Sequence, residues 1–181
     1  GIKRSGKRLL NTLNMILNFT KIESEKYQIV LKRLDVKDEL ETIEKMFRGA
    51  AIDKHIDMIL HCPDDLFINA DPSFFAVILE NLVNNAIKFT ERGSVSIAAG
   101  KEGNNVFISV KDTGIGIDKN NLEIIFEEFR QVSEGINREF QGTGLGLSIA
   151  KKYTELLNGS ISVESEPGAG SMFIIKFPAA E

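Results

Sequence analysis

The sequence is poor in the features that mark secreted or membrane-spanning proteins. Its only cysteine is Cys62, so no disulfide framework can form within one chain, and a reducing compartment is the natural setting. No apolar run approaches the roughly 20 residues needed to span a bilayer. The basic start, GIKRSGKRLL, is not followed by the apolar stretch and cleavage site of a secretory signal. We therefore expect neither a signal peptide nor a spanning helix within these residues.

The sequence also has no excess of basic residues over acidic ones. Lys and Arg number 22 against 26 Asp and Glu, a formal net charge of −4. We therefore expect no nucleic-acid partner and no attraction to an anionic membrane surface. The 181 residues, 43% of them hydrophobic, suffice for one globular domain of about 150 residues and an appendage. The abrupt charged start and the end just after a predicted strand lead us to expect a piece of a longer protein.

The first residues predict an amphipathic helix that ends within residues 22–26. Apolar side chains recur there at helical spacing, at Ile2, Leu9, Leu10, Leu13, Ile16, Leu17 and Phe19. This stripe has no partner in the local sequence and shows the narrow repeat of a helix-bundle seam. We expect it to pair with another chain, the alternative being that it folds back onto the rest of the protein.

The rest of the chain mixes predicted strands with predicted helices. The strands are expected over residues 27–34, 56–61, 67–70, 94–99, 106–111, 160–165 and 171–177. The helices are expected over residues 36–51, 72–88, 122–129 and 145–157, with Asp35 and Asp71 capping the first two. Hairpins are frequent and a regular βαβ rhythm is absent, which predicts an α+β fold. We expect a two-layer α/β sandwich, with a mixed sheet and helices on one face, preceded by one bundle-type helix.

The helix predicted from residue 72 has two distinct faces. Its apolar residues should pack on the sheet, namely Phe75, Ile78, Leu79, Leu82, Val83 and Ala86. Asn81, Asn85 and Lys88 are spaced i, i+4 and i+7, so they stack along a different face. Two neutral oxygen ligands and one cation suit a phosphate chain with its Mg²⁺, which takes oxygen donors and keeps several waters. A solvated helix face is the alternative interpretation of this pattern.

A carboxylate and two glycines follow the strand predicted over residues 106–111. The segment DTGIGI places Asp112 at the strand end, and Gly114 and Gly116 allow a backbone to approach a flat heterocycle. An ionised Asp only accepts hydrogen bonds, so it suits the exocyclic amine of adenine, whereas guanine would present another acceptor. A tight turn without a ligand is the alternative.

Glycines also precede the helix predicted from residue 145, in the segment GTGLGL at residues 142–147. The free N–H groups and positive dipole end of a helix start favour an anion. The segment is not a Walker A loop, and it does not follow a strand as a dinucleotide fingerprint does. Flexible packing of a helix start is the alternative.

A long polar connection, over residues 125–141, separates the second and third motifs. Connections of this length often cover a binding site, so we expect it to act as a lid. Its aromatic residues Phe126, Phe129 and Phe140 are the candidates to anchor it.

Taken in this order, the segments resemble the catalytic domain of sensor histidine kinases, within the group that includes the gyrase, Hsp90 and MutL ATPases. Residues 81–90 resemble the N box, 112–116 the G1 box, 125–129 the F box and 142–146 the G2 box. The resemblance implies a Bergerat ATP-binding fold for residues 27–181, with ATP and Mg²⁺ as cofactors. Glu128 departs from the family, which often has proline at this position of the lid.

The resemblance also implies a role for each matching residue. Asn85 would bind Mg²⁺, Asn81 and Lys88 would face the phosphates as catalytic residues, and Asp112 would bond the adenine amine. The glycines of the third motif would form the hinge of the lid and the phosphate-side backbone. The other positions implied for the nucleotide site are Phe89, Gly114, Gly116, Ile117, Phe129, Gly142, Thr143, Gly144, Leu145, Gly146 and Leu147.

The first helix is similar to the second helix of the dimerisation and histidine-phosphotransfer domain, which we assign to residues 1–26. This similarity implies a homodimer through such helices, a response regulator receiver domain as partner, and a cytoplasmic catalytic domain whose membrane anchor, if any, lies in other segments. In the family the phosphorylated histidine lies on the first helix of that domain, which these residues do not include. The only two histidines, His55 and His61, match no such motif, and we expect ordinary surface or strand residues.

Phosphotransfer and hydrolysis place different demands on the predicted site. A hydrolase needs a general base, and the ATPase members carry a glutamate one turn before the Mg²⁺ asparagine. Asn81 occupies that place and cannot take a proton, while Glu80 points about 100° away around the helix. We therefore expect the γ-phosphoryl group to pass to an imidazole. An ATPase of the gyrase or Hsp90 kind and a non-catalytic binding module stay open as alternatives.

Overall fold

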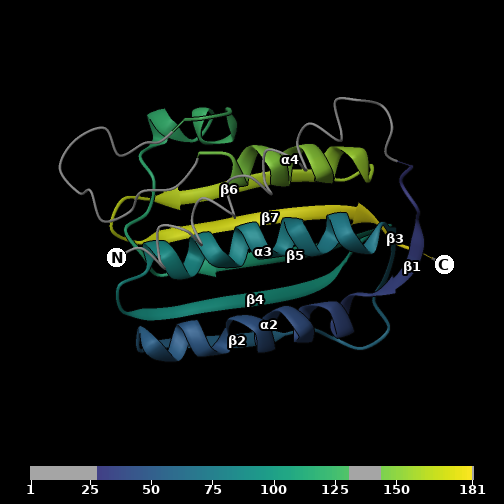
Figure 1. Ribbon diagram of the computed structural model, residues 1–181, viewed down its shortest axis with the longest axis horizontal. Coiled ribbons are helices and arrows are strands. Elements are labelled where there is room, and N and C mark those ends of the chain that lie inside the picture. The colour runs from purple at the N-terminus through teal and green to yellow at the C-terminus, as the bar shows by residue number, and fades with distance from the viewer. Residues whose placement is uncertain (1–27, 131–143, 181) are drawn as a thin grey trace, which may run out of the picture.

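The computed structural model describes residues 28–130 and 144–180 as a mixed sheet with helices on one face (Figure 1). The five-stranded sheet has the order β2-β4-β5-β7-β6, in which only β2 and β4 are parallel. Its strands are β2 (Ile56–His61), β4 (Gly93–Glu102), β5 (Asn105–Asp112), β6 (Ser160–Glu166) and β7 (Gly170–Pro178). The predicted α+β two-layer sandwich is confirmed for the described residues.

Three helices cover the sheet, with α3 between the other two (Figure 1). They are α2 (Val36–Asp53), α3 (Pro72–Phe89) and α4 (Gly146–Leu156). Both predicted aspartate caps are confirmed: Asp35 accepts the N–H of Lys37 at 2.9 Å, and Asp71 accepts the N–H of Ser73 at 3.0 Å. These caps fix where α2 and α3 begin, because each satisfies N–H groups that have no partner within the helix.

A small second sheet lies at one end of the molecule (Figure 1). Here β1 (Lys32–Asp35) pairs with the antiparallel β3 (Phe67–Ala70). Asp71, directly after β3, also accepts the N–H of Val30 through its second carboxylate oxygen, at 3.0 Å. The start of the described chain is therefore tied to the N-terminus of α3.

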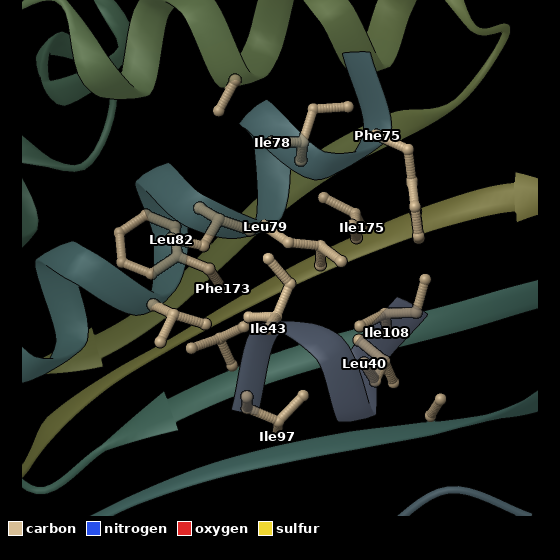
Figure 2. Close-up of a cluster of buried hydrophobic side chains, with 14 of the residues drawn as sticks. Leu40, Ile43, Phe75, Ile78, Leu79, Leu82, Ile97, Ile108, Phe173 and Ile175 are labelled. Carbon is tan, nitrogen blue, oxygen red and sulfur yellow. The ribbon is translucent and has the colours of Figure 1, made fainter. Parts of the chain in front are cut away.

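The hydrophobic core lies between the helices and the sheet. Figure 2 shows Leu40 and Ile43 of α2 meeting Leu79 and Leu82 of α3 above strand residues such as Ile108. The six apolar residues predicted to face the sheet from α3 are all buried, each with 3% or less of its surface exposed. Each such side chain contributes about 1.5–3 kcal/mol when fully buried, so this face holds α3 rigidly in place.

Several predicted element bounds are wrong; for example, the strand expected over residues 94–99 runs on to Glu102. The first strand begins at Lys32 and not at residue 27; the N–H of Val30 goes to the Asp71 carboxylate and not to a neighbouring strand. The helix expected over residues 122–129 is replaced by two short 3₁₀ turns, Lys119–Asn121 and Ile124–Phe126. Only one residue of these two turns, Ile125, is buried, so little packing would stabilise a longer helix here. The last helix begins one residue late, at Gly146.

The amphipathic helix predicted for residues 1–26 lies outside the described residues, so its stripe and the domain boundary at residue 26 stay predictions. No helix in residues 28–130 and 144–180 has the length and hydropathy needed to cross a membrane.

Candidate functional site

The three predicted motifs come together around α3. The loop that follows β5 lies against the C-terminal end of α3, where the N–H of Ile115 donates to the carbonyl of Phe89 at 3.3 Å. The start of α4 lies against the middle of α3: a Cβ atom placed on Gly146 would be 2.7 Å from Asn81 Oδ1. Residues far apart in the sequence therefore line one side of α3.

Asp112, the last residue of β5, is a buried carboxylate with one oxygen still available. Its side chain is 4% exposed. One oxygen, Oδ1, accepts the N–H of Gly114 at 2.8 Å and the N–H of Ser171 at 3.3 Å. The other, Oδ2, accepts no hydrogen bond from the described residues. Burial raises the pKa of Asp112, and the two backbone hydrogen bonds oppose that rise. A buried acceptor in this position gains most from a ligand that donates to it.

The glycines of the Asp112 loop are required by close packing. A Cβ atom on Gly114 would lie 2.9 Å from Asp112 Oδ1 and closer still to the carbonyl oxygen of Phe89. Gly116 has a positive φ of 69°, and its Cβ atom would collide with the carbonyl of Glu166. Both positions therefore hold the loop against its neighbours in a way that no larger residue allows.

The turn between β6 and β7 holds the Asp112 loop from its other side. Gly168 donates its N–H to the carbonyl of Ile115 at 2.7 Å, and Ile117 donates its N–H to Ser165 Oγ at 2.8 Å. Ser171, on the same hairpin, supplies one of the two bonds to Asp112. The sequence motifs did not identify these hairpin residues as part of the site, because no local signal marks a contact across about 50 residues.

The polar residues of α3 do not form a simple solvated face. Asn81 is only 9% exposed; its Nδ2 donates to the carbonyl of Val77 at 2.8 Å, and its Oδ1 faces the start of α4. Asn85 is half-buried, and its side chain forms no hydrogen bond with the described residues. Lys88 is half-buried too, with Nζ 4.5 Å from the centre of the Phe89 ring. The arrangement places an amide oxygen and a cation along one edge of α3.

The N-terminus of α4 has no side-chain cap. Its N-cap residue is Leu145, which is buried and cannot accept a hydrogen bond through its side chain. Among the described residues, no N-cap side chain gives the first N–H groups of α4 the bonds that Asp35 and Asp71 give to α2 and α3, and a helix start of this kind favours an anion. Leu147, in the first turn, is half-buried. Two predicted site residues, Gly142 and Thr143, lie outside the described part of the chain.

The predicted anchoring of the connection by aromatic residues is only partly confirmed. Phe126 packs edge-on against Phe173, with ring centroids 6.3 Å apart. Phe129 is 69% exposed, so its ring does not anchor the connection to the described part of the chain. Its backbone, with a φ of 61°, instead donates an N–H to the carbonyl of Gly144 at 3.1 Å. The third aromatic, Phe140, lies outside the described residues.

The donor set around α3 fits Mg²⁺ but not a metal held by protein ligands alone. Across residues 28–130 and 144–180, no three His, Cys, Asp or Glu side chains gather closely enough to hold a metal ion. One amide oxygen at Asn85 suits an ion that keeps several waters and takes its other ligands from phosphates. His55 is exposed in a turn and His61 is exposed on β2, so neither belongs to the site.

The chain belongs to the family described as histidine kinase-, DNA gyrase B- and HSP90-like ATPases, which matches residues 70–181. It is 35% identical over 179 residues to sensor histidine kinase RcsC of Escherichia coli strain K12, covering 98% of this chain and 19% of that protein. It is 40% identical over 182 residues to autoinducer 2 sensor kinase/phosphatase LuxQ of Vibrio vulnificus strain YJ016, covering 96% of this chain and 21% of that one. The chain thus spans about a fifth of the length of these two relatives.

Solved structures agree with this assignment. Full-length ShkA in complex with AMPPNP has a TM-score of 0.87 and 30% identity, covering 98% of this chain and 37% of ShkA. The nucleotide-free catalytic domain of histidine kinase ThkA has a TM-score of 0.73 and 30% identity, covering 82% of this chain and 95% of that domain. The Bergerat-type sheet and its helices are therefore shared with histidine kinase catalytic domains.

Proposed function

We propose that the chain binds Mg²⁺-ATP and presents the γ-phosphate to a histidine of a dimerisation domain, as one step in signalling to a response regulator. The observation that carries the proposal is the available Oδ2 of buried Asp112 at the end of β5, which matches the donor of an adenine amine. The ATPase family match and the AMPPNP in the complex of ShkA, a similar protein, support nucleotide binding by the chain.

The remaining site residues would bind the phosphate groups of ATP and their Mg²⁺ ion. The start of α4, which has no side-chain cap, and the Lys88 ammonium would both favour the negative charge of the phosphates. Asn85 offers the oxygen that Mg²⁺ prefers, and the ion would neutralise charge on the phosphates. In the transfer, a histidine nitrogen bonds to the γ-phosphorus while the bond to the β–γ bridging oxygen breaks, and ADP leaves. This chain would supply orientation and charge neutralisation.

Transfer is favoured over hydrolysis by the residues of α3. Asn81 stands one helical turn before Asn85 and cannot act as a base. Glu80 is half-buried without an ion pair among the described residues, and burial raises its pKa. It points about 100° away from Asn81 around the helix, so it does not face the start of α4. Water activation by a carboxylate therefore has no candidate on the relevant face.

The histidine and the receiver domain would come from other parts of the system. ThkA has been solved in complex with the response regulator TrrA, and that structure has the fold of this chain, with a TM-score of 0.77 at 24% identity. By analogy we assign the partners of the whole protein as a second copy, paired through its dimerisation helices, and a receiver domain. We place the catalytic domain in the cytoplasm.

Changing Asn85 to alanine should remove most of the magnesium dependence of ATP binding. Removal of the amide oxygen leaves Mg²⁺ held by phosphates and water alone, so affinity in Mg²⁺ should fall about tenfold, the size of one charge-assisted contact. Binding in the presence of a chelator should barely change. Calorimetric titration of a non-hydrolysable ATP analogue, with and without Mg²⁺, measures both.

Asn84→Ala is the matched control, because Asn84 is the exposed neighbour of Asn85 on the same helix. It should bind like the wild type in both conditions. If Asn85→Ala keeps the full magnesium dependence, Asn85 is not the ligand. If the wild type fails to bind the analogue in either condition, the proposed function is wrong.

A further inference from the structure

The C-terminal end of α3 has all four of its terminal carbonyls satisfied, and it uses three different partners to do so. The last four carbonyls of a helix have no partner within it. That of Ala86 accepts both the N–H of Thr90 at 3.1 Å and the Thr90 hydroxyl at 2.7 Å. That of Phe89 accepts the N–H of Ile115 from the Asp112 loop. The two that remain, on Ile87 and Lys88, are met from another helix.

Lys54, the C-cap residue directly after α2, supplies those bonds. Its Nζ donates to the carbonyls of Ile87 at 2.7 Å, Lys88 at 3.1 Å and Thr90 at 3.0 Å. An ammonium group has three protons, so this geometry uses all of its donor capacity. Lys54 forms no ion pair with a carboxylate in the described part of the chain, so its charge is directed at the negative end of the α3 dipole.

We propose that Lys54 is a positioning residue for the nucleotide site, acting through the last turn of α3. This inference rests on the proposed function, because it concerns the same site. The turn that Lys54 holds carries Lys88, the cation placed near the phosphates. It also carries Phe89, whose carbonyl accepts the N–H of Ile115 and is packed against Gly114.

Few contacts separate Lys54 from the Asp112 carboxylate, which is the group proposed to bind adenine. Gly114, which lies between the Phe89 carbonyl and the Asp112 side chain, donates its N–H to Asp112 Oδ1 at 2.8 Å. A shift of the last turn of α3 therefore moves the loop that fixes the Asp112 carboxylate. Because Lys54 projects from α2, it also links the position of that helix to the site.

Lys54→Met, which keeps the length of the side chain and removes the ammonium, tests the proposal. We expect the affinity for the Mg²⁺-ATP analogue to fall about tenfold, as when a charged hydrogen-bonding group is removed. We also expect the Ile115 amide to exchange with solvent much faster, while amides in the middle of β5 and β7 keep their protection. Both are measured well below the melting temperature.

Two control variants separate positioning from charge and from stability. Lys37→Met removes a lysine from the other end of α2, where it pairs with exposed Asp64. Ile43→Val trims a core residue of the same helix that is 2% exposed, and should lower the melting temperature. Both should bind the analogue within about twofold of wild type, because additivity holds for sites without shared partners.

Unchanged affinity in a folded Lys54→Met protein would overturn the proposal, as would an equal loss in the Ile43→Val protein. If Lys54→Met does not fold, Lys54→Gln takes its place with the same expectations, since an amide keeps two donor protons and loses the charge. The exchange rate of the Ile115 amide tests the packing role even in the absence of nucleotide. If the wild-type protein does not bind the ATP analogue, the proposed function is wrong, but the effect of Lys54 on the Ile115 amide can still be measured.

Discussion

Replacing Asp112 with asparagine should weaken ATP binding about 10- to 100-fold while the domain stays folded. The amine of adenine would lose its bond to an ionised carboxylate, and hydrogen bonds to charged groups contribute about 1.5–3 kcal/mol. Asparagine can still accept the N–H groups of Gly114 and Ser171 through its carbonyl oxygen, so the loop keeps its support. Calorimetric titration with ATP and GTP measures the effect. The wild type should prefer ATP at least about tenfold, and the variant should lose that preference.

The direction in which the same substitution changes the free energy of unfolding can also be predicted. Burial raises the pKa of Asp112 in the folded state, so the folded protein binds a proton more readily than the unfolded chain between the ordinary and the raised pKa. Stability therefore falls as pH rises through that window, and the unfavourable contribution is fully present above it. At neutral pH the asparagine variant without nucleotide should be at least as stable as wild type. A marked loss of stability, or equal affinity for ATP and GTP in the wild type, would contradict the role given to Asp112.

Gly114→Ala should be strongly destabilising, by about 1–3 kcal/mol or more, because forcing a methyl group into a packed site causes strain of that size. The added carbon would meet the carbonyl oxygen of Phe89, which is backbone and cannot rotate away. The loop would also shift Asp112, so ATP affinity should fall together with stability. Urea unfolding followed by circular dichroism measures the free energy of unfolding.

Gly49→Ala is the control for the Gly114 change. Gly49 lies inside α2, and a Cβ atom placed on it meets nothing within 4 Å. Alanine should therefore stabilise the protein by about 0.5–1 kcal/mol, the helix propensity difference between the two residues. A Gly114→Ala protein as stable as wild type would show that the loop does not need the close approach to α3.

Features with a local cause could be predicted from the sequence. Asp35 and Asp71 cap helices at the expected residues because the capping bonds themselves reach only two and three positions further along the chain. The strands Ile56–His61 and Phe67–Ala70 have the bounds that their flanking turn residues predicted. The apolar face of α3 is buried as expected, since helical spacing alone defines it.

Features that depend on distant residues could not be predicted. The helix expected around residue 125 rested on local apolar spacing, but two short 3₁₀ turns form there and only Ile125 of these turns is buried. Ser165 and Ser171 support the Asp112 loop across a hairpin, and Lys54 caps a helix more than 30 residues away. These contacts exist only in the folded chain. The roles of Asn81, Asn85 and Lys88 remain predictions, although the structure places all three on one side of α3.

The fate of bound ATP tests the central claim most directly. The chain is incubated with Mg²⁺ and ATP labelled on its γ-phosphate, and the nucleotide and the protein are then separated and counted. We predict that bound nucleotide is recovered as intact ATP, with no acid-labile phosphate on the protein and no sustained phosphate release. The site would then hold ATP for an imidazole that this chain does not supply. Label on His55 or His61, or steady hydrolysis through many turnovers, would contradict the account.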